Sequence, residues 1–132
     1  MTELAESDRE RFDALLEGVL DGLPEGLVRR LEEIPLIVED FPDPAVLAEM
    51  GLPADEPLCG LHTGHMLTER SVEDAYRLPS EIHVFRRGVI EIAGGWEAGD
   101  AAVGEEIRIT LLHELGHHFG LDEDDLEALG YD

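Results

Sequence analysis

The segment LLHELGHHFGLDEDD, residues 111–125, combines histidines and carboxylates at a spacing that suits metal chemistry. His113 and His117 are four residues apart, so on a helix their ring nitrogens can approach the same ion. Glu114 lies about 100° around the helix from His113, close enough to reach a water on that ion without ligating it. The H-E-x-x-H pattern therefore predicts two zinc ligands and a general base on one helix.

A catalytic zinc site also needs a third protein ligand and one open coordination position. Gly120 can end the helix in a left-handed conformation and turn the chain back sharply. Glu123, three residues further on, could then face the same ion as a third ligand, with Asp122 and Asp124 as adjacent alternatives. His118 points away from the face of the two motif histidines, which predicts a supporting or surface position.

These residue types predict metal-assisted hydrolysis. Two neutral imidazoles and one carboxylate would leave the zinc site with a net charge of about +1 and acidify a bound water to a pKa near 7. Glu114 would take the proton of that water as it attacks a carbonyl, and would pass it to the leaving amine. No covalent enzyme intermediate is needed.

The helix that carries this motif is expected over residues 100–119. Helices are also expected in residues 7–23 and 25–34, with a strand within residues 35–42. Around the pair Arg87-Gly88, alternating residues predict a hairpin of residues 82–86 with 89–93. This order predicts an α+β fold in which helices pack against one side of a small sheet. The motif helix would contact the sheet through five apolar residues: Ile107, Leu111, Leu112, Leu115 and Phe119.

Composition narrows the class of protein further. At 132 residues the chain is expected to form one domain over residues 1–132. Its formal net charge of -23 opposes binding to nucleic acids and anionic membranes, and favours cations or basic peptides. Cys59 is the only cysteine, so no intrachain disulfide can form. Without an apolar signal or membrane segment, the prediction is a cytoplasmic protein.

The motif and its surroundings resemble the bacterial minimal zincins, which carry an H-E-x-x-H-x-x-G-x-x-D pattern. The resemblance is closest in EEIRITLLHELGHHFGLDEDDLEALGY, and it extends to LPEGLVRRLEEIPLIVEDFP, LCGLHTGHMLTERS and IHVFRR. It implies a minimal zincin-like fold and a zinc metallopeptidase in which His113 and His117 bind zinc and Glu114 is the base. Where the family usually has aspartate as third ligand, this chain has Glu123. Its methionines all precede the motif, so the methionine turn of the metzincins proper is absent.

Other residues could take part in the chemistry. Cys59, His62 and His65 form a C-x-x-H-x-x-H pattern in an irregular segment and could bind a second metal. An exposed edge strand of the expected hairpin could pair with an extended peptide, with Arg86 and Arg87 as carboxylate contacts. Tyr76 and Tyr131 are candidate oxyanion donors.

Two further function classes compete with a peptidase. In the first, zinc has a purely structural role, and the protein is a non-catalytic module that binds peptides or proteins. The second is a group of endoribonucleases that share the histidine spacing. They have glycine at the position of Glu114, and the negative net charge of this chain would repel RNA phosphates. The sequence therefore favours a zinc-dependent enzyme that hydrolyses peptide bonds in a peptide or protein substrate.

Overall fold

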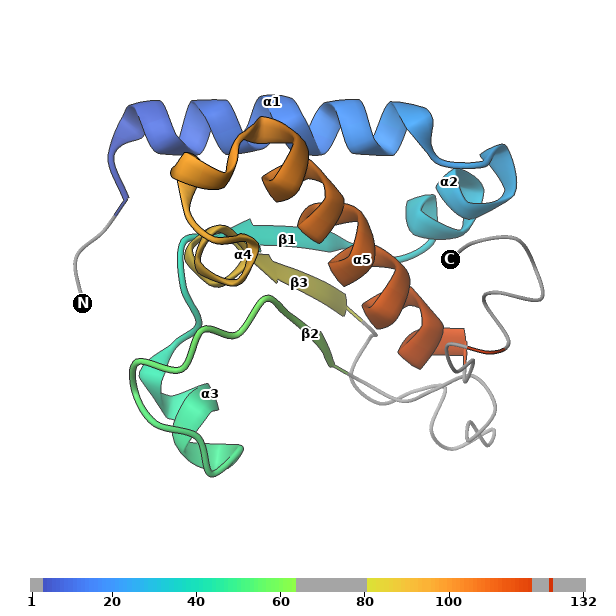
Figure 1. Cartoon of the computed structure of the whole chain (residues 1–132). Helices are drawn as coiled ribbons and strands as arrows, with labels where there is room; N and C mark the ends of the chain where they lie inside the picture. The colour runs from blue at the N-terminus through green and yellow to red at the C-terminus, as the bar shows by residue number, and fades with distance from the viewer. Residues whose placement is uncertain (1–3, 64–80, 120–123, 125–132) are drawn as a thin grey trace, which may run out of the picture.

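The computed structural model describes residues 4–63, 81–119 and 124 (Figure 1). The described part of the chain combines helices with one small sheet, as the sequence predicts. In chain order its elements are α1 (Glu6–Gly22), α2 (Glu25–Glu32), β1 (Leu36–Glu39), α3 (Pro44–Glu49), β2 (Gly60–Thr63), β3 (Glu81–Phe85), α4 (Arg86–Ala93), the 3-10 turn η3 (Trp96–Ala98) and α5 (Asp100–Phe119).

The sheet has β3 in the middle, parallel to β1 and antiparallel to β2. Val84 pairs with Val38 of β1 on one side and with Gly60 of β2 on the other. A further backbone hydrogen bond, from the Phe85 amide to the Cys59 carbonyl at 2.8 Å, continues the pairing just before β2. In the described sheet, β2 therefore has one edge that pairs with no strand.

The helices α1, α2 and α5 cover one face of this sheet (Figure 1). Alternate β3 residues, Ile82 and Val84, are fully buried beneath them, as a strand with a single covered face requires. Two clusters of buried hydrophobic residues form the core, and α5 contributes to both. One set is Phe12, Leu16, Val84, Val89, Ile90, Val103, Ile107 and Leu111, and the other is Leu27, Leu31, Ile34, Ile82, Leu112 and Leu115. The predicted α+β class and the helix over residues 100–119 are thus confirmed.

No helix in the described ranges is both long enough and apolar enough to cross a bilayer.

The predicted hairpin is wrong in its second half, because residues 89–93 belong to α4. Val89 and Ile90 are consecutive and both buried in the same core, which a helix permits but a strand with alternating faces does not. Gly88 is not a turn residue. A Cβ there would lie 1.9 Å from the carbonyl oxygen of Leu58, so the position needs glycine for close packing of α4. Gly94, with φ of 107°, ends the helix in the left-handed region.

The true partner of β3 lies in the segment expected to be irregular. Residues 60–63 form β2, a strand of four residues that includes a glycine and a histidine. Such a strand has little intrinsic preference for extended structure, so its conformation depends on pairing with β3 and on packing against α5.

A partly buried charge network joins α1 to the end of β1 and the start of α4. Asp40 accepts hydrogen bonds from Arg9 Nε at 2.9 Å and from Arg86 Nη1 at 3.0 Å, and Arg86 also binds Asp13 through Nε at 2.9 Å. Arg87 pairs with Glu91 at 3.0 Å. The arginines suggested as substrate contacts therefore bind carboxylates of the protein itself.

Replacing Asp40 by asparagine should lower the free energy of unfolding by about 2 kcal/mol near pH 7. Burial alone would raise the pKa of Asp40, but the hydrogen bonds and charges of Arg9 and Arg86 outweigh it and lower the pKa below 3.8. A depressed folded-state pKa stabilises the protein above the unfolded-state value, and this stabilisation is lost as the pH falls from about 3.8 through the folded-state pKa.

Urea denaturation of both proteins from about pH 7 down to about pH 3 measures this effect. The difference between wild type and Asp40→Asn should shrink in the acid range. Glu25→Gln is the matched control because its carboxylate pairs with Arg29 on the exposed surface, where such a pair contributes less than about 1 kcal/mol. A pH-independent difference for Asp40→Asn would contradict the assigned role of the charge.

Candidate metal centre and cleft

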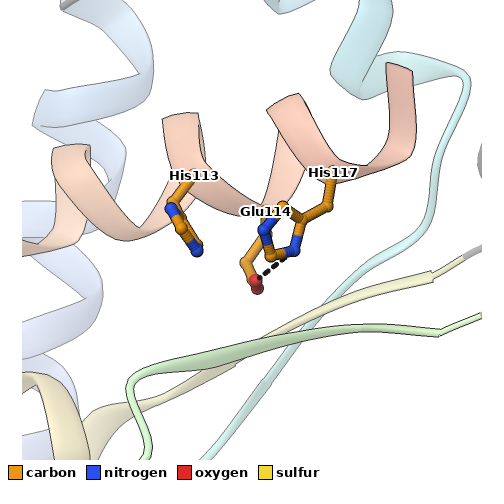
Figure 2. Close-up of side chains that lie close together, drawn as sticks. All are labelled: His113, Glu114 and His117. Atoms are coloured by element: carbon orange, nitrogen blue, oxygen red, sulfur yellow. Dashed lines mark ion pairs between the residues drawn. The ribbon is translucent and has the colours of Figure 1, made fainter. Parts of the chain in front are cut away.

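The motif residues occupy the side of α5 that faces β2. Four aliphatic residues, Ile107, Leu111, Leu112 and Leu115, are buried against the sheet and the other helices, which fixes the rotation of α5 about its axis. This rotation directs His113, Glu114 and His117 from one side of the helix toward β2 (Figure 2). Phe119, also expected in this core, has a side chain outside the described part.

These three side chains form a compact group. The potential ligand atoms all lie within 4.8 Å of one another, and the two imidazole rings have centroids 4.3 Å apart. His117 Nδ1 lies 3.4 Å from Glu114 Oε1 (Figure 2). Both histidines are exposed, whereas Glu114 is buried. The arrangement leaves two imidazoles accessible to an ion in solution, with a carboxylate held behind them.

Glu114 has the surroundings expected of a base or an ion partner. Burial raises its pKa, and nearby His113 partly opposes this effect. In the described part of the chain, its Oε2 atom is buried without a hydrogen-bond partner. A buried polar atom normally has such a partner. A cation or a water beside the two histidines would satisfy it, so the residues present fit a bound metal.

A cleft of about 390 Å³ lies beside this group, between α5 and the segment that leads into β2. This volume lies in the range of small-ligand sites. Besides the three motif residues, its lining comprises Met50, Leu58, Cys59, Gly60, Leu61, His62, Glu106, Ile109 and Thr110. The lining therefore comes from three separate parts of the chain: Met50 at the end of α3, residues 58–62, and α5.

Gly60 allows β2 to approach α5 closely. A Cβ at this position would lie 2.7 Å from Thr110 Cγ2, 3.0 Å from the His83 carbonyl oxygen and 3.1 Å from Glu114 Cγ. A larger residue would displace either the strand or the Glu114 side chain. The glycine thus sets the width of the cleft where the carboxylate is buried.

His62 and His118 contact each other across the interface of β2 with α5. Nε2 of His62 lies 3.3 Å from Nδ1 of His118, and the rings meet edge to face. His118 is buried, so the surface position allowed by the sequence is wrong. His62 also lines the cleft.

Cys59, which the sequence suggested as a ligand of a second metal, lines the cleft. Burial is the main cause that raises the pKa of its thiol to about 11, and the charges of Glu106 and Glu114 raise it further. A hydrogen bond with Thr110 lowers the pKa in part. Among the described residues, the one group able to hold a metal is His113, Glu114 and His117, which includes neither Cys59 nor His62.

Several candidate residues lie outside the described part of the chain, namely Glu123, Asp122, His65, Tyr76 and Tyr131. Asp124 is described, and it is helical with an exposed side chain. The third-ligand assignment therefore stays a prediction.

Comparison with known proteins identifies the family. The sequence model of the zincin-like metallopeptidases matches residues 31–131, which include the sheet, the cleft and the H-E-x-x-H helix. The chain belongs to this family. No curated protein matches it. Membership as a zincin-like metallopeptidase implies zinc as the metal, and the group of His113, Glu114 and His117 could bind it.

The sequence analysis missed most of the cleft wall of this zincin-like metallopeptidase. Glu106 and Thr110 precede His113 by seven and three residues, so helical periodicity could have placed them on the same side of α5. Leu58, Leu61 and Met50 gave no comparable signal, because they reach the cleft only through the pairing of β2 and the position of α3.

Proposed function

We propose that this protein is a zinc-dependent peptidase that hydrolyses peptide bonds in the cleft between α5 and β2. The observation that carries the proposal is the buried Glu114 carboxylate beside two exposed imidazoles in a cleft. In the proposed mechanism, His113 and His117 bind zinc through neutral imidazole nitrogens, and Glu123 is the third ligand.

Glu114 is the general base of the proposed reaction. Its raised pKa makes it a better proton acceptor than a solvated carboxylate, and Oε2 can accept a hydrogen bond. The carboxylate takes a proton from the attacking water and donates it to the nitrogen of the leaving amine. When bound, zinc supplies the Lewis acidity that lowers the pKa of water and polarises the peptide carbonyl.

The sheet offers a way to hold the substrate. Within the described residues, β2 pairs only with β3, and it lies beside the helix that carries the motif. An extended peptide can add to such an edge through backbone hydrogen bonds. In our proposal β2 takes the role that the sequence analysis gave to the hairpin, because β3 is central and residues 89–93 are helical.

Metal content tests the ligand assignment. Purified wild-type protein should hold about one zinc ion per chain after dialysis, whereas His113→Ala should retain a small fraction of that amount. His83→Ala is the control, because His83 contacts Glu39 and Glu81 at 3.1 Å and does not line the cleft. Undiminished zinc in His113→Ala would rule out this ligand set.

Cleavage of a diverse peptide pool, followed by mass spectrometry, tests the activity. The zinc-loaded protein should produce new peptide termini, and chelation should stop their formation. Bound zinc without metal-dependent cleavage of any peptide would favour the non-catalytic peptide-binding module instead.

A further inference from the structure

The cleft beside the motif has a mainly aliphatic wall. Met50, Leu58, Leu61 and Ile109 line it. Met50 and Ile109 are 44% and 46% exposed, and they are two of the three large hydrophobic side chains most exposed in the described part of the chain. Exposed apolar side chains gathered at a cleft are typical of a binding surface.

Glu106 adds a single negative charge to this wall. Apart from Glu114, it is the one carboxylate among the residues that line the cleft. Its side chain is half-buried, and no ion pair found among the described residues includes it. The adjacent Glu105 is different, because it is exposed and pairs with Arg108 at 3.1 Å.

The charge of Glu106 acts inside the cleft. It is the second-largest cause, after burial, of the raised pKa of the Cys59 thiol on the facing wall. A carboxylate at the edge of an aliphatic surface matches a side chain with an apolar stem and a cationic head. Arginine and lysine have this form.

The position of Glu106 on α5 sets its distance from the motif. It precedes His113 by seven residues, which corresponds to about 10 Å along the helix axis at 1.5 Å per residue. An extended peptide advances about 3.3 Å per residue. A long side chain can therefore reach Glu106 from a position within about four residues of a peptide bond held beside His113 and His117.

We propose that this cleft selects peptides with an arginine or lysine within about four residues of the cleaved bond, with the side-chain stem against Met50 and Ile109 and the cationic head beside Glu106. The inference rests on the proposed function, because it assumes that the peptide lies along α5 beside the motif. The net charge of -23 attracts basic peptides from a distance, but it does not select a position within them. Glu106 provides that selection.

Binding to a protein that cannot complete hydrolysis tests this subsite. Zinc-loaded Glu114→Gln is titrated with fluorescent peptides of eight residues in which one arginine is scanned through every position. Each peptide has a partner with citrulline, which has nearly the same shape but no charge. At one or more positions, the arginine peptide should bind about fivefold more tightly, and the ratio should fall with added salt.

Two double variants, each with one substitution added to Glu114→Gln, locate the source of this preference. Glu106→Gln, added to Glu114→Gln, should bring the ratio of arginine to citrulline affinity close to one. Glu105→Gln, added in the same way, removes the same amount of charge one residue away and should leave the ratio unchanged. Equal affinities for both peptides at every position, or a ratio that survives Glu106→Gln, would overturn the inference.

The same peptides separate this inference from the proposed function. If wild-type protein cleaves none of them but Glu106→Gln still abolishes the arginine preference, the peptidase assignment fails and the basic subsite stands. If wild-type protein cleaves arginine and citrulline peptides at equal rates and binds them equally, the peptidase stands and the subsite fails.

Discussion

Replacing Glu114 by glutamine is expected to lower the rate of peptide hydrolysis by about 10²- to 10⁴-fold while leaving bound zinc at its wild-type level. The amide is similar in size to the carboxylate but cannot accept and return a proton at neutral pH. The proposed ligands His113 and His117 are unchanged in this variant. Rates are measured on a peptide identified in the pool, together with zinc content and the thermal unfolding midpoint.

Glu105→Gln is the control for this experiment. It removes one carboxylate from the same helix, but at an exposed position paired with Arg108 and away from the cleft lining. Its hydrolysis rate should equal that of wild type. Turnover by Glu114→Gln at the wild-type rate, with zinc bound, would exclude Glu114 as the base and require a different proton acceptor.

Replacing Gly88 by alanine is expected to produce the largest loss of stability of any change considered, about 3 kcal/mol or more. The new Cβ would lie 1.9 Å from the Leu58 carbonyl oxygen and 2.5 Å from its carbonyl carbon. These are backbone atoms, so rotation of a side chain cannot relieve the overlap. Either α4 or the segment before β2 must move.

The shift in the urea midpoint of unfolding measures this loss. Gly104→Ala is the matched control, because Gly104 lies inside α5 and a Cβ there meets no atom within 4 Å. That substitution should stabilise the protein by about 0.5–1 kcal/mol through helix propensity. A Gly88→Ala protein as stable as wild type would show that the contact of α4 with Leu58 is not as close as the structure indicates.

The Gly88 variant also links the fold to the proposed function. Leu58 and Cys59, which the new Cβ would displace, line the cleft, whereas the motif histidines belong to α5. A partly folded Gly88→Ala protein should therefore lose peptide binding before it loses zinc. This order would separate the wall of the cleft from the metal ligands.

Hydrophobic periodicity and turn residues in the sequence predicted several elements close to their observed bounds. The helices over residues 7–23 and 100–119 agree with α1 and α5 to within a residue or two, and the strand before Pro42 agrees with β1. The pairing of residues 82–86 with 89–93 was wrong, because Val89 and Ile90 have a high strand preference but pack into the core of α1 and α5 as part of a helix.

The spacing in HELGH by itself determined which residues could act together, because two histidines four positions apart must share one side of a helix. The family match includes this segment, within residues 31–131. Only the tertiary structure decided that Glu114 is buried, that β2 forms the facing wall and that Glu106 lies in the same cleft. These properties depend on contacts between residues some fifty positions apart in the chain, such as Gly60 with Thr110 and Glu114, which no local pattern encodes.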